Sequence, residues 1–234
     1  MIQGISFGRG VFFHDRHVLA CAEVKNGTIH LWAETITPMT IFKMWLRVIF
    51  SLPWYYNVFH AGLIAYFLLT SGVFPAADLP FALPELDPYW AFVYLAGFHF
   101  VFPARLKKFH GAEHKVFSYA GVKKVGAWQE IGKADIVNQG CSTNLVTCFF
   151  LLFLLVFPVA PLEISVWAGA AGILIGFLGD RVLRRYLPFI YRLSAMLQRY
   201  VTTKEPDRIH LETAIRSYLL FLHQRDQAAQ VKAA

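Results

Sequence analysis

Three side chains near the middle of the sequence have the types and the spacing of a metal site. Residues 109–115 read FHGAEHK, in which His110, Glu113 and His114 form the pattern H-x-x-E-H. If this segment is helical, the two histidines share one face, where two neutral imidazoles can hold one Zn²⁺. Glu113 would then stand beside the ligands as the general base for a metal-bound water, as in the inverted zincin pattern. We therefore predict His110 and His114 as metal ligands and Glu113 as a catalytic residue.

A third ligand is available in the segment NQGCSTN, residues 138–144, which contains Cys141. This segment opens an apolar stretch that should start from the same side as the two histidines, so the chain topology brings the thiol close to them. A thiolate raises the affinity of a site for zinc, and zinc is the cofactor that we expect. His14 and His17 are candidates for a fourth ligand.

The opposing hypothesis gives the same residues a purely structural role. Glu113 would pair with Lys107, Lys108 or Lys115 at a surface, and the histidines would be polar residues of that surface. Cys141 would then be a small buried residue at the start of a helix, a common place for cysteine. Spacing alone does not decide between the two hypotheses.

The elements that must position these residues belong to a very apolar chain. Of its 234 residues, 56% are hydrophobic and only 16% are charged, which favours an integral membrane protein over an ordinary soluble domain. Four apolar stretches are predicted to be transmembrane helices, and they cover residues 54–74, 89–104, 144–160 and 164–179. Only the segment PLE separates the last two stretches, so they should form a tight hairpin.

The basic residues of the chain, whose net charge is +7, are sorted by loop. They gather in residues 105–140 and after the fourth stretch, and none occurs in the loops 75–88 and 158–164. By the positive-inside rule, both termini and the 105–140 loop are cytoplasmic in a multi-pass protein of the plasma membrane. Its partners would be the lipid bilayer, with anionic headgroups meeting residues 105–108, and a membrane protein, but no nucleic acid.

The expected fold class is a mainly α membrane protein with about four transmembrane helices, a small N-terminal β unit and C-terminal amphipathic helices in the cytoplasm. Residues 1–37 form the β unit, in which Asn26-Gly27 signals a hairpin. Residues 38–186 form the membrane domain with its cytoplasmic loop at 105–143. Residues 187–234 form the amphipathic helices and the tail.

Four blocks of the sequence, taken in order, resemble a known family. They are IQGISFGRG, FHGAEHK, NQGCSTN and TTKEP followed by LETAI. The chain is similar to the YqhQ-like bacterial membrane proteins, a domain of unknown function whose members are described as predicted metal-dependent enzymes. The resemblance implies a fold and a metal site, but it brings no reaction and no substrate.

Two departures from that family bear on the metal site. Gln3 stands where the family has Glu, and Asn138 stands where the family has His. If that family histidine is a ligand, Asn138 replaces it poorly, because an amide oxygen suits harder cations than zinc. The departures weigh against a fully active site.

Three functions follow from these observations. The first is a metal-dependent hydrolase at the cytoplasmic membrane boundary, built on His110, His114, Cys141 and Glu113. The second is a non-catalytic accessory protein that binds a membrane partner and has a structural or degenerate metal site. The third is a transporter, which ranks last because His60 and His99 are the ionisable residues within the spans and have no acidic partner there.

Overall fold

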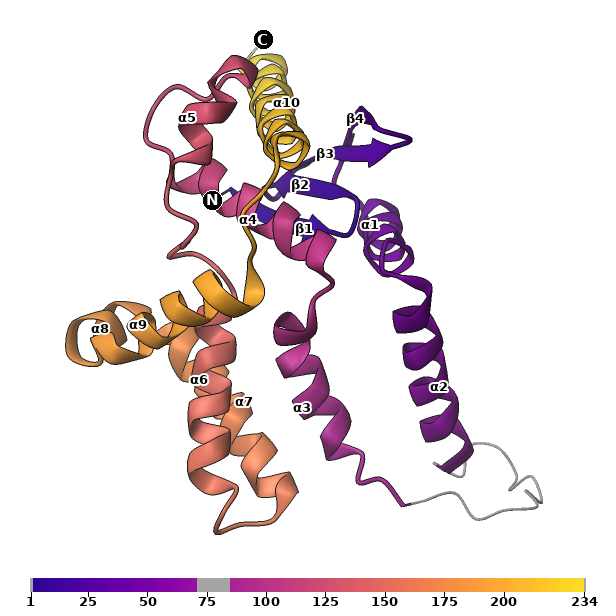
Figure 1. Ribbon diagram of the computed structural model, residues 1–234, viewed down its shortest axis with the longest axis vertical. Helices are drawn as coiled ribbons and strands as arrows, with labels where there is room; N and C mark the ends of the chain where they lie inside the picture. The colour runs from indigo at the N-terminus through magenta and orange to yellow at the C-terminus, as the bar shows by residue number, and fades with distance from the viewer. Residues whose placement is uncertain (1, 71–84, 234) are drawn as a thin grey trace. The chain divides into compact units, whose positions relative to one another are not determined.

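The computed structural model describes residues 2–70 and 85–233, which divide into two compact units (Figure 1). Unit 1 contains residues 1–51, 100–141 and 193–234, and unit 2 contains residues 52–99 and 142–192. The chain therefore leaves unit 1 and returns to it twice.

Unit 1 contains an antiparallel sheet whose four strands follow each other in sequence order. The strands are β1 (Gln3–Phe7), β2 (Gly10–His14), β3 (Val18–Lys25) and β4 (Thr28–Thr35). The hairpin between β3 and β4 turns at Asn26 and Gly27, which have φ angles of 50° and 77°. Both angles are positive, as a two-residue hairpin turn of the predicted kind requires, so the predicted turn is confirmed.

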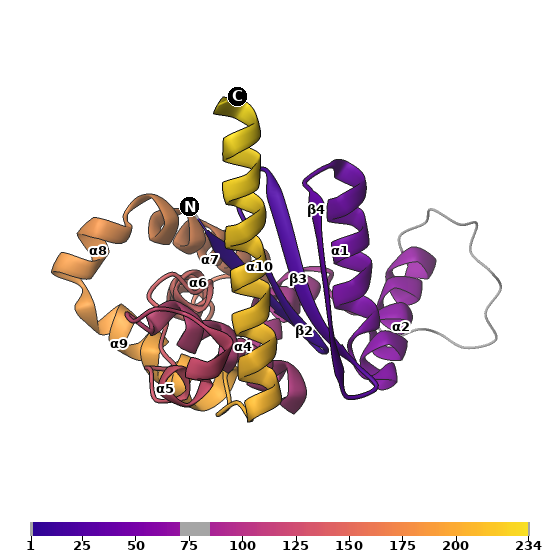
Figure 2. The ribbon, with the colours of Figure 1, turned by 90° about the horizontal axis from the view of Figure 1, so that it is seen from above.

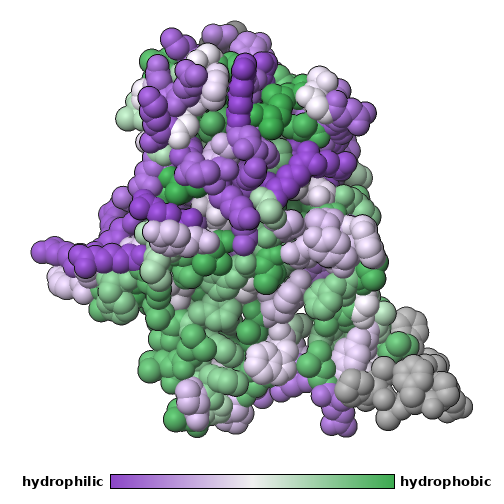
Figure 3. Space-filling view, in the orientation of Figure 1, coloured by the Kyte–Doolittle hydropathy of each residue, from purple (hydrophilic) through white to green (hydrophobic). Residues whose placement is uncertain are grey.

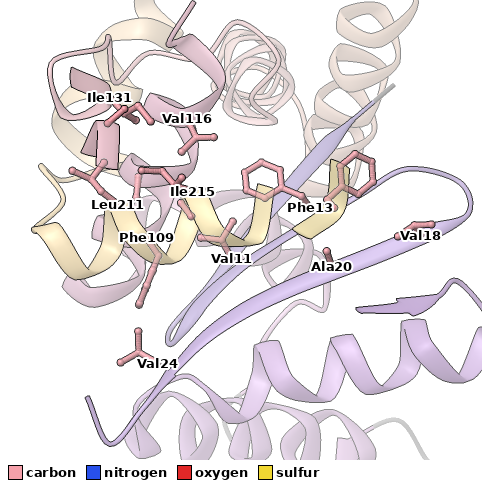
Figure 4. Close-up of a cluster of buried hydrophobic side chains, with 14 residues drawn as sticks. Val11, Phe13, Val18, Ala20, Val24, Phe109, Val116, Ile131, Leu211 and Ile215 are labelled. Carbon is pink, nitrogen blue, oxygen red and sulfur yellow. The ribbon is translucent and has the colours of Figure 1, made fainter. Parts of the chain in front are cut away.

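The side chains of the sheet alternate between two apolar layers. One layer packs against α4 (Ala104–Ser118) and α10 (Arg208–Ala233), and Figure 4 shows its members. The other layer packs against α1 (Pro38–Phe50) through Met44 and Val48. The sheet is thus covered on both faces, with α10 on one side and α1 on the other (Figure 2).

Helix α10 carries the apolar face that the sequence predicts, and this face packs on the sheet. Leu211, Ala214 and Ile215 are buried in the core, and the Ser217 hydroxyl donates a 2.9 Å hydrogen bond to the carbonyl oxygen of Val11. The remaining short elements of unit 1 are η2 (Val125–Ala127), α5 (Trp128–Gly132) and the π-helical turn η3 (Gln198–Thr202).

Unit 2 is helical. Its elements are α2 (Trp54–Thr70), α3 (Tyr89–Gly97), α6 (Thr143–Val156), α7 (Leu162–Leu178) and α8 (Asp180–Tyr186), while η1 (Phe98–Val101) and α9 (Pro188–Leu197) continue from unit 2 into unit 1. Helices α6 and α7 form the tight hairpin that the sequence predicts. A Cβ at Gly172 would lie 2.5 Å from the carbonyl oxygen of Cys148, so the absence of a side chain lets the two backbones approach.

The predicted fold class, with four transmembrane helices, is wrong in its spans. Within residues 2–70 and 85–233, no single helix is both long enough and apolar enough to cross a bilayer. Helices α7 and α8 satisfy length and composition only as a pair, and the pair is bent by 92°. Helix α6 has 14 residues and stops before Pro158; at 1.5 Å per residue it is about 21 Å long. The end of the first predicted span, residues 71–74, lies outside the described residues.

The fold is therefore a helical one with a small four-stranded antiparallel sheet. The apolar stretches of the sequence remain visible on the surface of unit 2, where Figure 3 shows hydrophobic residues over a broad area. Large exposed apolar side chains on its helices include Trp54, Phe59, Ile64, Leu155, Trp167, Leu174, Phe177 and Leu178.

Candidate metal centre

Helix α4 brings two of the predicted ligands together. His110 and His114 are one helical turn apart, their ring centroids are separated by 4.2 Å, and both side chains are buried, with exposed fractions of 8% and 0%. This is the arrangement that the spacing i, i+4 dictates on a helix. The two imidazoles therefore present nitrogen atoms to the same small volume.

Cys141 joins them from the turn that precedes α6. Its sulfur lies 3.6 Å from Nε2 of His110, and one donor atom from each of His110, His114 and Cys141 lies within 4.8 Å of the others. The sequence predicted this convergence from a topology of four transmembrane helices, which the helices within residues 2–70 and 85–233 do not support. The three buried side chains could bind a metal ion.

Asn138 forms the turn that presents the thiol. Its side-chain oxygen accepts a 2.9 Å hydrogen bond from the backbone N–H of Gly140, and its carbonyl oxygen accepts one of 3.2 Å from the backbone N–H of Cys141. Its own backbone N–H donates to Oε1 of Gln198, which is buried in η3. Asn138, one of the two residues that depart from the resembled family, therefore stabilises this turn.

His114 is fixed in one tautomer by its neighbour. Its Nδ1 donates a 2.7 Å hydrogen bond to the carbonyl oxygen of Ile136, because a carbonyl can only accept. The proton is thus placed on Nδ1, and Nε2 carries the lone pair. Nε2 is buried and has no hydrogen-bond partner within the described residues. A histidine held through one nitrogen with the other free has the usual arrangement of a metal ligand.

Glu113 lies behind His110 and is itself buried. Its Oε2 is 3.5 Å from Nδ1 of His110 and accepts a short hydrogen bond from the hydroxyl of Ser6 on β1. A side chain at Gly4 would collide with this carboxylate, so glycine at that position makes room for it. Sequence reasoning missed Gly4 and Ser6 as parts of the site, although the IQGISFGRG block that contains them was one signal of the resemblance.

The lysines that the opposing hypothesis paired with Glu113 are engaged elsewhere. Lys107 donates to the carbonyl oxygen of Phe100, and Lys108 pairs with Asp207 at 2.6 Å. Lys115 is buried and donates to the carbonyl oxygens of Gly132 and Ala134, at 2.6 and 3.1 Å, while pairing with Glu205 at 3.1 Å. Lys115 thereby ties the chain just before Ile136 to helix α4.

The other histidines and Gln3 lie outside the cluster. Nδ1 of His14 contacts the carbonyl oxygen of Asp15 at 3.1 Å, and exposed Gln3 stands opposite His14 in the sheet. Among the residues that the structure describes, the potential metal-binding group contains His110, His114 and Cys141, and neither His14 nor His17 belongs to it.

The pKa shifts in the site favour a protonated His110 beside a deprotonated Cys141 and a deprotonated Glu113. Burial alone lowers the pKa of His110, but its hydrogen bonds to Cys141 and Glu113 outweigh burial and raise the pKa to about 10. Burial raises the pKa of the Cys141 thiol, yet its hydrogen bond with His110 and the proximity of His114 bring it well below its usual value. Burial likewise raises the pKa of Glu113, and its hydrogen bond with His110 reverses that direction. A metal at Nε2 of His110 would displace a proton, because a ligating imidazole is neutral.

Comparison with known proteins assigns the chain to a family through its central and C-terminal parts, and the N-terminal block of the resemblance lies outside the matched region. No curated protein and no solved structure matches the chain significantly. Residues 91–224, more than half of the chain, match the family model described as protein of unknown function (DUF1385), and this region contains both helix α4 and Cys141. The chain therefore belongs to the DUF1385 family of proteins of unknown function.

Proposed function

We propose that His110, His114 and Cys141 bind one zinc ion. The observation that carries this proposal is Nε2 of His114, a buried nitrogen that has no hydrogen-bond partner in the described part of the chain and lies near a thiol and a second imidazole. A buried polar atom of this kind costs about 1–3 kcal/mol when it is unsatisfied, which a metal ion would relieve. One thiolate and two imidazoles suit zinc better than magnesium or calcium, whose ligands are oxygens.

We propose further that the site is the centre of a metal-dependent hydrolase. Three protein ligands are the usual number at catalytic zinc sites, where the ion supplies Lewis-acid activation of water. Glu113 keeps Nδ1 of His110 occupied, so that Nε2 points toward the thiol. For Glu113 to move protons as the sequence predicts, its carboxylate must first leave the hydroxyl of Ser6. The finer likeness to YqhQ-like predicted metal-dependent enzymes is part of this proposal.

A second candidate is a non-catalytic metal clip in an accessory protein. It is favoured by the complete burial of His114 and by the two contacts that already occupy Oε2 of Glu113. In this function the metal would join α4 to the turn at Cys141, and Glu113 would only orient His110. The two candidates share the same ligands and differ in the role of Glu113.

Metal content tests the shared part of the proposal. Protein purified from zinc-supplemented cells should contain about one zinc per chain by elemental analysis. The variant His114→Ala should lose the zinc, because only two of the three proposed ligands remain. His17→Ala, a histidine outside the cluster, is the matched control and should retain zinc. A wild-type protein without metal, or equal zinc in both variants, would contradict the proposal.

Glu113→Gln then separates the two candidates. The amide keeps the shape of the side chain and its contact with Ser6, but it is no longer a base. A hydrolase should keep its zinc and lose at least 100-fold in turnover of an ester or peptide substrate panel. A metal clip should keep its zinc and its cellular function, measured by complementation of a deletion strain.

We also propose that unit 2 contacts a lipid bilayer. The large apolar side chains exposed on α2, α6 and α7 form a surface of the kind that rarely stays in water. Arg181 and Arg185 on α8 follow directly after α7 and are exposed, which suits anionic headgroups.

A further inference from the structure

A pocket of about 350 Å³ in unit 1 lies outside the metal centre, where the beginnings of α4 and α10 meet the end of β3. Val24, Phe109 and Ile209 form its apolar wall, and Arg105, Lys108 and His210 provide its polar groups. In Figure 4, Phe109 and Val24 lie next to each other at one end of the core cluster. The volume is within the range of small-molecule sites.

Helix α4 begins at Ala104, which lines this pocket, and no described side chain caps this end of the helix. Pro103 in the N-cap position makes no side-chain hydrogen bond to the helix, and the first turn contains no acidic residue. The N–H groups of a first turn have no partner inside the helix, and the helix dipole makes this end positive. Arg105 adds a further positive charge in the same turn, so the local field is one that an anion would stabilise.

His210 gives a second, independent indication of a ligand. Its exposed fraction is 7%, and its buried Nδ1 has no hydrogen-bond partner within the described residues. The ring is held edge-on against Phe109, with the centroids 4.6 Å apart, and lines the pocket. Its nearest charged oxygen is Oδ2 of Asp207 at 3.5 Å, and that atom already accepts a 2.6 Å hydrogen bond from Lys108. A ligand oxygen in the pocket could supply the hydrogen-bond partner that Nδ1 of His210 lacks among the described residues.

The charges beside the pocket leave one cation uncompensated. Lys108 is paired with Asp207, whereas Arg105 makes no ion pair within the described residues and lies over the ring of Phe109, 6.0 Å from its centroid. A guanidinium suits phosphate because its planar donors can bind two oxygens at once. We propose that the pocket binds a phosphate ester that carries an apolar group, with the phosphate at Arg105 and the start of α4 and the apolar group against Phe109 and Val24.

Equilibrium binding to the full-length protein tests this proposal with hexyl phosphate and inorganic phosphate as probes. Hexyl phosphate should bind at least tenfold more tightly, because only it can fill the apolar wall. Arg105→Gln, an exposed substitution, should weaken hexyl phosphate binding at least tenfold, and His210→Phe, which keeps the ring, should weaken it several-fold. Lys124→Gln removes one exposed positive charge away from the pocket and should leave binding unchanged.

Competition by vesicles identifies the source of the ester. Phosphatidic acid in phosphatidylcholine vesicles should displace hexyl phosphate if the natural ligand is a lipid, whereas a lack of displacement by vesicles that do bind the protein assigns the pocket to a soluble ester. Equal binding of the two phosphates would overturn the apolar part of the proposal. Unchanged binding in both Arg105→Gln and His210→Phe would overturn the site itself.

Discussion

At the scale of single residues, the ring of His114 is already held in the orientation that the proposed metal site requires. The carbonyl oxygen of Ile136 accepts a hydrogen bond from Nδ1–H, and Nε2 is buried. The orientation and tautomer of the ring are thus fixed by a backbone carbonyl that no substitution of the Ile136 side chain would remove. A site of this kind gives up little side-chain entropy on metal binding, because the ring is already immobilised.

A second buried carboxylate, Glu23, supports the sheet of unit 1. Its exposed fraction is 1%, and it pairs with Lys25 at 2.9 Å and with Arg47 of α1. Burial raises the pKa of Glu23, but Lys25 and Arg47 together hold it below its usual value of 4.5. Because the folded-state pKa is the lower one, the ion pairs contribute stability above about pH 4.5 and lose it as the pH falls further.

Glu23→Gln should therefore lower the free energy of unfolding by about 1–2 kcal/mol at pH 7, since it leaves two partly exposed cations without their carboxylate. The deficit relative to wild type should shrink as the pH falls below about 4.5, when the wild-type carboxylate also gains a proton. Urea unfolding at several pH values measures this. Glu34→Gln, whose partner Lys43 is more exposed, should cost under about 0.5 kcal/mol. A deficit independent of pH would contradict the assignment.

At the scale of elements, helix α4 is packed so closely that one of its positions has no room for a side chain. A Cβ at Gly111 would collide with the carbonyl oxygen of Lys204 and lie 3.0 Å from Cδ1 of Ile136. The backbone N–H of Lys204 also donates a 3.0 Å hydrogen bond to the carbonyl oxygen of Lys107. Glycine lowers the helix propensity of the motif, but at position 111 it is needed because the segment containing Lys204 packs directly against the helix there.

Gly111→Ala should lower the free energy of unfolding by about 1–3 kcal/mol, because backbone atoms must move to admit the methyl group. It should also reduce zinc content, since displacement of Ile136 moves the acceptor that fixes His114. Denaturant unfolding and elemental analysis measure the two effects. Gly126→Ala, where a Cβ would meet nothing within 4 Å, is the control and should change stability by under about 0.5 kcal/mol.

Local patterns in the sequence predicted the elements that depend on neighbours in the chain. The i, i+4 spacing of His110 and His114 and the Asn26-Gly27 turn are of this kind, and both are present. The contacts of Ser6 with Glu113 and of Gln198 with Asn138 join residues far apart in sequence, and one sequence contains no signal of which distant partners meet. The prediction of transmembrane spans was wrong for another reason. The apolar composition of the stretches is clear in the sequence, but Pro158 and the bend after α7 limit the length of the helices.

At the scale of the molecule, large apolar side chains are exposed on helices of both units. Unit 1 exposes them mainly on α1, for example Phe42 at 53% and Trp45 at 58%, whereas unit 2 exposes them on several helices, including Trp167 at 64% and Phe177 at 69% on α7. A lipid surface is the partner that we propose for those of unit 2, and flotation with vesicles tests it.

Full-length protein should float with phosphatidylglycerol-containing vesicles, and more strongly at low salt. The double substitution Trp167→Gln and Phe177→Gln should weaken partitioning at least tenfold, because each side chain contributes about 1.5–3 kcal/mol when it leaves water. Val122→Gln, which changes an apolar side chain 81% exposed in unit 1, is the control and should float like wild type. Equal flotation of all three proteins, or none, would exclude unit 2 as the lipid-binding surface.

The return of the chain to unit 1 also sets an order of events during synthesis. All three proposed ligands have been made once residue 141 is complete, but Gln198, which holds the turn of Asn138, and Lys204, which packs over Gly111, come more than 50 residues later. At about 5–20 residues per second, the growing chain therefore carries an unsupported thiol for several seconds before these residues are made. A chain cut short before Gln198 would lack both supports, and we expect its Cys141 to be open to oxidants.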